Sequence, residues 1–171
     1  MPAVLAAPGP LIFWHVATAV AAVAAVFGDP RFDYRLLLVG SVLPMLDAVT
    51  GGRWIMHTLA FSVGLVVVVM LATIGRRDVR RRWLALPIGT LLYLVFSASW
   101  NDAATFWWPA GGWGVLGDQD VPFVERPLVV TAGLEVAGLA LVIWGWRRAR
   151  LSEQRRRDEL LSEGHLDFVV N

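Results

Sequence analysis

Asp47 and His57 are the two residues whose types and spacing are most typical of a functional site. They lie ten positions apart, on either side of a Gly51-Gly52 turn, at the facing ends of two apolar segments. A carboxylate and an imidazole can bind a metal ion or transfer a proton near neutral pH. The stretch from Gly40 to His57 is therefore the predicted centre of a site, and other elements must bring further polar groups to it.

The composition is typical of a membrane protein that crosses the bilayer several times. The 171 residues are 57% hydrophobic, and the mean hydropathy of +0.59 is well above that of an ordinary soluble domain. All 15 basic residues are Arg, and most occur in two clusters. The absence of Cys excludes disulfides, thiolate metal sites and a Cys nucleophile. The sequence contains no phosphate-binding glycine loop and no nucleic-acid-binding module, so we expect no nucleic-acid partner.

The apolar runs predict an all-α integral membrane bundle with five short transmembrane helices. The N-terminus lacks a basic region, so we expect the first apolar segment to be retained. We expect a transmembrane domain over 1–146 and an Arg-rich tail over 147–171, with helical spans near 11–27, 36–50, 54–74, 83–100 and 127–146. The second segment is short, and Gly40 and Pro44 should bend or break it. Four spans with a re-entrant second segment are the alternative.

The arginine distribution favours five spans. The cluster from Arg76 to Arg82 and the Arg-rich tail should both face the cytoplasm. With five spans, only Arg53 and Arg126 of the 15 arginines lie outside, whereas four spans also place Arg31 and Arg35 there. We therefore expect an inner-membrane protein with a cytoplasmic C-terminus and an extracytoplasmic N-terminus.

The intramembrane polar residues favour the same topology. With five spans, all of them fall in the outer half of the bilayer, where they can meet: His15, Asp47, His57, Asp102 and Glu135. A carboxylate inside a span, such as Glu135, is costly and by default indicates a function.

Four separated elements resemble the YdjM-like family of LexA-binding, inner-membrane-associated hydrolases, also called membrane-bound metal-dependent hydrolases. The resemblance covers residues 14–114. It rests on a His in the first helix, a Leu-Pro-Asp-x-Asp element, a Thr-His-Ser element, and a later Gly followed by Trp-Pro. The matching positions here are His15, Leu43-Pro44-Met45-Leu46-Asp47, Met56-His57-Thr58, Gly89 and Trp108-Pro109.

The resemblance implies metal-dependent hydrolysis of a lipid or lipid-linked substrate at an outward-facing site. His15, Asp47 and His57 would bind a divalent metal ion, with zinc as one candidate. Glu135 and Asp102 would be the supporting acid and base residues. Three family positions are replaced here, by Met45, Tyr93 and Ser97.

The same residues permit a second interpretation, because three of the expected acids and imidazoles are missing. The chain would then be a non-catalytic relative that acts as a membrane scaffold or binds a protein partner. His15 would be hydrogen-bonded to a helix carbonyl, and Asp47 would cap the turn that follows it. The Arg-rich tail could bind a protein partner or anionic lipid headgroups.

Overall fold

The apolar runs fold into helices at all five predicted positions. The computed structural model describes residues 11–29, 32–49, 55–113 and 127–168, and these ranges contain helices but no strands. The five main helices are α1 (Ile12–Phe27), α2 (Tyr34–Val42), α4 (Leu59–Ala72), α6 (Ala85–Phe96) and α8 (Leu128–Arg148). The short elements are η1 (Leu43–Met45), α3 (Leu46–Val49), η2 (Ile55–His57), α5 (Arg77–Trp83), η3 (Ser99–Asn101), α7 (Ala103–Phe106) and α9 (Gln154–Glu163).

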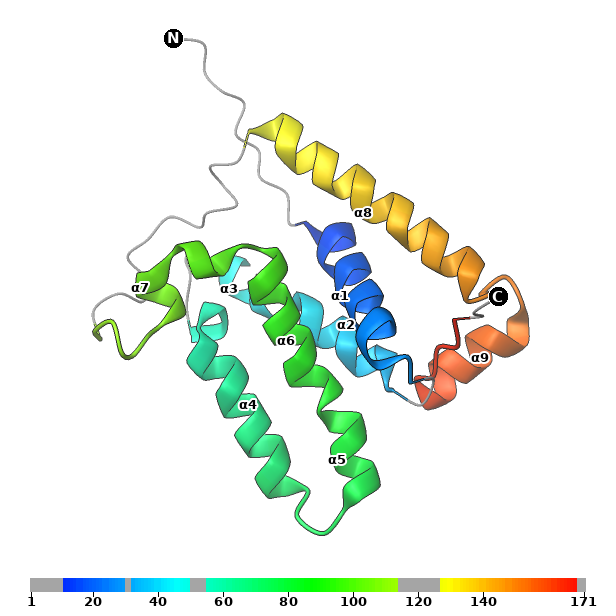
Figure 1. Ribbon diagram of the computed structural model, residues 1–171, viewed down its shortest axis with the longest axis horizontal. Coiled ribbons are helices and arrows are strands. Elements are labelled where there is room, and N and C mark those ends of the chain that lie inside the picture. The colour runs from blue at the N-terminus through cyan, green and yellow to red at the C-terminus, as the bar shows by residue number, and fades with distance from the viewer. Residues whose placement is uncertain (1–10, 30–31, 50–54, 114–126, 169–171) are drawn as a thin grey trace.

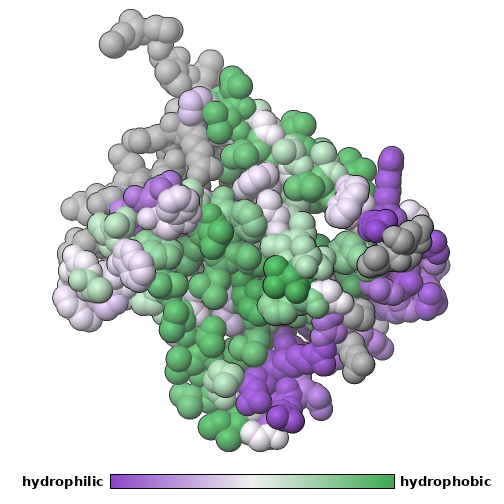
Figure 2. Space-filling view, viewed as in Figure 1, coloured by the Kyte–Doolittle hydropathy of each residue, from purple (hydrophilic) through white to green (hydrophobic). Residues whose placement is uncertain are grey.

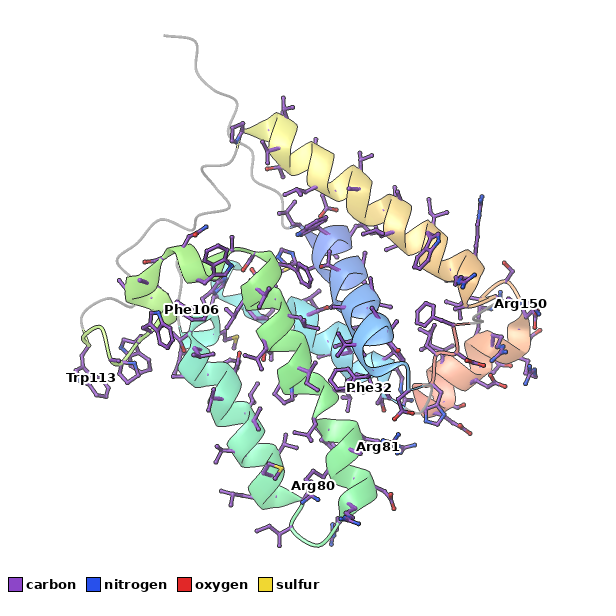
Figure 3. All side chains as sticks on the ribbon, viewed as in Figure 1. Phe32, Arg80, Arg81, Phe106, Trp113 and Arg150 are labelled. Carbon is purple, nitrogen blue, oxygen red and sulfur yellow. The ribbon has the colours of Figure 1, made fainter. Side chains whose placement is uncertain are left out.

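The main helices alternate in direction, so that their ends form two layers (Figure 1). Helices α1, α4 and α8 run toward α5 and α9, and α2 and α6 run back toward α3 and α7. The end formed by residues 28–29, 32–35, 76–84 and 147–157 is called the arginine-rich end below. Phe32, Arg81 and Arg150 all lie on this side of the molecule (Figure 3).

Proline breaks the second apolar segment, as predicted. The Asp33 side chain caps α2 by accepting hydrogen bonds from the backbone N–H groups of Arg35 and Leu36. The α-helix ends at Val42, and Pro44 lies in the 3₁₀ turn η1 before α3 resumes. Because Pro lacks an N–H group, it cannot continue the α-helical hydrogen-bond ladder. The break places Asp47 near the end of the segment.

Glycine allows α2 and α6 to pack with their backbones in contact. A Cβ atom added at Gly89 would lie 2.5 Å from the Leu37 carbonyl oxygen and 2.7 Å from the Ser41 nitrogen. A Cβ at Gly40 would collide with the Leu86 carbonyl. Gly40 is therefore needed for the close approach of α2 to α6. Such small-residue contacts are typical of helix pairs in membranes.

Helix α1 is held between α6 and α8. Gly138 of α8 lies against the backbone of Phe13 and Trp14, where a Cβ would collide. On its other side, the Trp14 indole donates a hydrogen bond to the Phe96 carbonyl of α6, with an N–O distance of 3.2 Å. These contacts fix the first turns of α1 beside the C-terminal half of α6.

The tail folds back onto the start of α2. The Tyr34 N–H donates to the Gly164 carbonyl at 2.8 Å, and the Arg35 guanidinium donates to the carbonyls of Leu161 and Ser162. Gly164 is required here because its φ is +78° and because a Cβ would collide with the Asp33 carboxylate. A hydrogen bond to Asp33 raises the pKa of the Arg35 guanidinium, and burial raises the pKa of Tyr34 to about 12.

Helix α8 is the one helix in the described ranges that is long and apolar enough to cross a bilayer by length and composition. Only 6% of its most apolar 18-residue stretch is buried inside the molecule, whereas the core helix of a soluble protein is mostly buried. Helices α1 and α4 and the segment Tyr34–Met45 are apolar but shorter. Apolar residues cover much of the face shown in Figure 2, and its strongest hydrophilic patches lie over α5 and the tail.

Candidate functional site

Asp47 and His57 are in direct contact. The Nδ1 atom of His57 lies 3.0 Å from Asp47 Oδ2, and the same oxygen accepts the Met56 N–H at 3.0 Å. Both side chains are buried, with exposed fractions of 1% for His57 and 5% for Asp47. Because a carboxylate accepts and does not donate, His57 Nδ1 carries the proton. The predicted carboxylate–imidazole pair is therefore present, with a fixed imidazole orientation.

A helix cap holds His57 in place. Thr58 precedes α4, and its hydroxyl accepts the Phe61 N–H at 3.0 Å. The same hydroxyl donates to the Ile55 carbonyl at 2.7 Å, which closes the turn η2. His57 thus lies in the turn just before α4, and its ring is directed toward Asp47. Thr58 is the N-cap type expected at this position.

Tyr93 of α6 connects His57 to His15. Its hydroxyl lies 3.3 Å from His57 Nε2. When the imidazole is neutral, this nitrogen accepts a hydrogen bond from the hydroxyl. The Tyr93 ring stacks on the His15 ring, with centroids 4.4 Å apart, and meets the His57 ring edge-on at 5.5 Å. We call His15, Asp47, His57 and Tyr93 the polar centre. Its four residues come from α1, α3, η2 and α6, and their side chains are almost fully buried.

His15 is bonded to its own helix. Its Nδ1 atom lies 2.6 Å from the Leu11 carbonyl oxygen, and its exposed fraction is 1%. Since a carbonyl can only accept, the Nδ1 proton is donated to it. The interpretation of His15 as a histidine bonded to a helix carbonyl is therefore confirmed.

Glu135 and Asp102, the predicted acid and base residues, cap other helices. Glu135 Oε2 accepts the Phe13 N–H at 3.3 Å and so satisfies one of the first N–H groups of α1. Asp102 accepts the Thr105 N–H at the start of α7. These contacts give both carboxylates structural partners at helix N-termini.

Ser97 lies at the end of α6, where the resemblance has an Asp. Its hydroxyl lies 2.6 Å from the hydroxyl of Ser99 and 3.3 Å from the Leu94 carbonyl. Ala98, between the two serines, adopts a left-handed φ of 59°, which ends the helix. Position 97 therefore carries a neutral hydroxyl that forms hydrogen bonds at the end of α6.

The residues predicted to bind a metal ion make other contacts. Both ring nitrogens of His57 are hydrogen-bonded to protein groups, and His15 Nδ1 is bonded to Leu11. Within the described ranges, no group of three or more His, Cys, Asp or Glu side chains is placed to hold a metal ion. Zinc takes three or four protein ligands. Tyr93 contacts both imidazoles, and the metal-ligand role of His15, Asp47 and His57 stays a prediction.

Tyr93 makes more contacts in the polar centre than the family motif suggests. The motif treats it as a missing His, whereas the structure uses its hydroxyl and its ring to contact two imidazoles. The signal in the sequence is a lone Tyr in an otherwise apolar run, where a buried hydroxyl needs a hydrogen-bond partner.

Comparisons with protein-family models, with curated proteins and with solved structures found no match to this chain. The resemblance to the YdjM-like family therefore rests on the sequence motifs alone.

Proposed function

We propose that the protein is an integral protein of the inner cell membrane that crosses the bilayer five times. The supporting observation is the apolar surface of the main helices. Helix α4 exposes Val67, Val68 and Leu71 by 50% or more, and α8 exposes Val129 and Val136 by 82% and 68%. Patches of this kind mark contact with lipid or with another protein. Lipid is the solvent that suits apolar residues on all sides of a helix.

The contacts at the arginine-rich end support five spans rather than four. Arg81 is paired with Asp29, and Arg35 is bonded to carbonyls of α9. Asp29 and residues 32–35 thus share one end of the bundle with both arginine clusters. We propose that this end, with the C-terminal tail, faces the cytoplasm, and that the N-terminus and the polar centre face outward.

We infer that the protein is a membrane scaffold or partner-binding protein in which the polar centre links helices and does not catalyse hydrolysis. The observation that carries this proposal is the saturation of His57, whose two nitrogens are bonded to Asp47 and Tyr93. Interhelical hydrogen bonds in membranes stabilise by about 0.6–2 kcal/mol each. A chain of buried bonds across the bundle is therefore sufficient reason for these residues to be present.

Hydrolysis of a lipid or lipid-linked substrate is the second candidate. The contact between Asp47 and His57 favours it, because a carboxylate that orients an imidazole is also how general bases are positioned. This candidate requires Tyr93 to move away from His57 Nε2 and so free that nitrogen for a reactant.

Metal content separates the scaffold proposal from metal-dependent hydrolysis. The full chain should be purified in detergent, incubated with Zn²⁺, desalted and assayed for bound metal beside His57→Ala, with His165→Ala as the control at a histidine of the tail. We expect far less than one ion per chain in all three. A variant with Met45→Asp, Tyr93→His and Ser97→Asp should gain metal, because it restores the family's ligands. Stoichiometric metal that is lost only in His57→Ala would contradict the scaffold proposal.

The topology can be tested separately, because the chain has no Cys of its own. Single substitutions Ala3→Cys, Ala110→Cys and Ser152→Cys should be labelled in intact cells with an impermeant maleimide. We expect labelling at positions 3 and 110 and none at 152 until the cells are opened. Labelling at 110 without labelling at 3 would support four spans instead.

A further inference from the structure

An apolar cavity of about 580 Å³ lies between α1 and α8. Its α1 wall is made of small side chains, among them Ala17, Ala21 and Ala24, and its α8 wall includes Leu141 and Trp144. The two helices meet near Gly138 and separate toward α9 (Figure 1). The cavity is thus the wedge between them. Its volume falls in the range of about 300–1,000 Å³ that is typical of ligand pockets.

A second, polar cavity of about 190 Å³ adjoins the first. Leu151 and Leu166 line both cavities, so these two side chains form the boundary. The polar cavity is lined by Arg156, Glu159, His165 and Asp167 of the tail. An apolar volume that meets a charged one at the end of an apolar helix has the form of a site for an amphipathic molecule.

The Arg156 guanidinium is only loosely paired with the carboxylates of the polar cavity. Its contacts with Glu159 and Asp167 are both long, at 3.5 Å, and its side chain is 20% exposed. Its buried Nε atom has no hydrogen-bond partner among the described residues. A buried donor of a charged group without a partner is costly. A phosphate group in the cavity would replace these long contacts, since guanidinium and phosphate form paired hydrogen bonds.

The carboxylates of the polar cavity decide which phosphate ligand fits. Glu159 is already paired with Arg155 at 2.7 Å, and His165 is paired with Glu163 at 3.1 Å. Asp167 is 54% exposed, and its contact with Arg156 is long. One guanidinium and one carboxylate therefore face the cavity together. That pair complements a headgroup with a phosphate and a primary ammonium and disfavours a purely anionic one.

We propose that the two cavities form a binding site for phosphatidylethanolamine. Its acyl chain occupies the wedge between α1 and α8, its phosphate accepts from Arg156, and its ammonium donates to Asp167. The site rests on the proposed membrane location and on the arginine-rich end lying at the bilayer surface, and it is independent of the polar centre.

Native mass spectrometry of the full chain in detergent tests this proposal with three dioleoyl lipids, which carry ethanolamine, choline or glycerol headgroups. We expect one phosphatidylethanolamine per chain, bound more tightly than either other lipid. Arg156→Gln and the wedge-filling Ala21→Phe should each weaken it about tenfold. The matched controls are Arg82→Gln, at an exposed arginine of α5, and Ala72→Phe, on the far helix α4, and both should bind like the wild type.

Asp167→Asn keeps the proposal testable if Arg156→Gln reduces helicity. It should abolish the preference for ethanolamine over choline, because choline has no N–H group to donate. Equal or tighter binding of phosphatidylglycerol by the wild-type chain would overturn the proposal. Unchanged phosphatidylethanolamine binding in both Ala21→Phe and Asp167→Asn would overturn it too. Extraction of the protein from membranes by alkali alone would instead refute the membrane location.

Discussion

Replacing Gly89 with Ala tests the close packing of α2 and α6. The added Cβ would lie 2.5 Å from the Leu37 oxygen, 2.7 Å from the Ser41 nitrogen and 2.8 Å from the Gly40 carbonyl carbon. All three atoms belong to the backbone of α2. No side chain can rotate away to make room, so the two helices must separate.

The expected loss of stability follows from two opposing effects. Overpacking of this kind costs about 1–3 kcal/mol. Ala favours a helix interior over Gly by about 0.5–1 kcal/mol. The net effect of Gly89→Ala should therefore be a destabilisation of up to about 2.5 kcal/mol.

Gly64→Ala is the matched control, because a Cβ at Gly64 of α4 would meet nothing within 4 Å. It should stabilise by about 0.5–1 kcal/mol through helix propensity alone. Unfolding by SDS in mixed micelles, followed by circular dichroism, measures both variants against the wild type. If Gly89→Ala is as stable as Gly64→Ala, the backbone contact between α2 and α6 does not exist in the folded protein.

Two further predictions concern Tyr34 and Glu135. The chain has 2 tyrosines, so in a Tyr93→Phe variant the tyrosinate absorbance reports Tyr34 alone. We expect its midpoint near pH 12, because burial raises its pKa to about 12. The stability that this burial contributes is present below about pH 10 and is lost as the pH rises toward 12. A midpoint near pH 10 would show that the tail does not cover Tyr34. Glu135→Gln keeps an oxygen that can accept the Phe13 N–H, whereas Glu135→Leu does not. In the same unfolding assay, the Leu variant should lose about 0.5–2 kcal/mol relative to the Gln variant, and equal stabilities would contradict the capping role.

The positions of the helices could be predicted because each apolar run is bounded by Gly, Pro or charged residues. The break at Pro44 follows from the missing N–H group of Pro, and the contact between Asp47 and His57 follows from their places at facing helix ends. These are local consequences of the sequence, and the structure confirms them.

The contacts between distant elements could not be predicted in the same way. Glu135 reaches the first turn of α1 across 122 positions. Only the register of α8 against α1, set by the close approach at Gly138, brings the carboxylate there. The role of Tyr93 also depends on packing, because its ring must lie against two imidazoles from other elements. Neither register nor ring orientation is encoded in a local pattern.

The hydrogen bonds between the start of α2 and the end of α9 constrain the order of assembly. Tyr34 and Arg35 are made early, but their partners Leu161, Ser162 and Gly164 are made more than 120 residues later. All five main helices are therefore synthesised before this end of the bundle can close. Until residues 160–168 emerge, the wedge between α1 and α8 lacks the side chains of Leu160, Leu166 and Phe168 that line it. A segment that follows all five main helices thus completes a contact begun by α2.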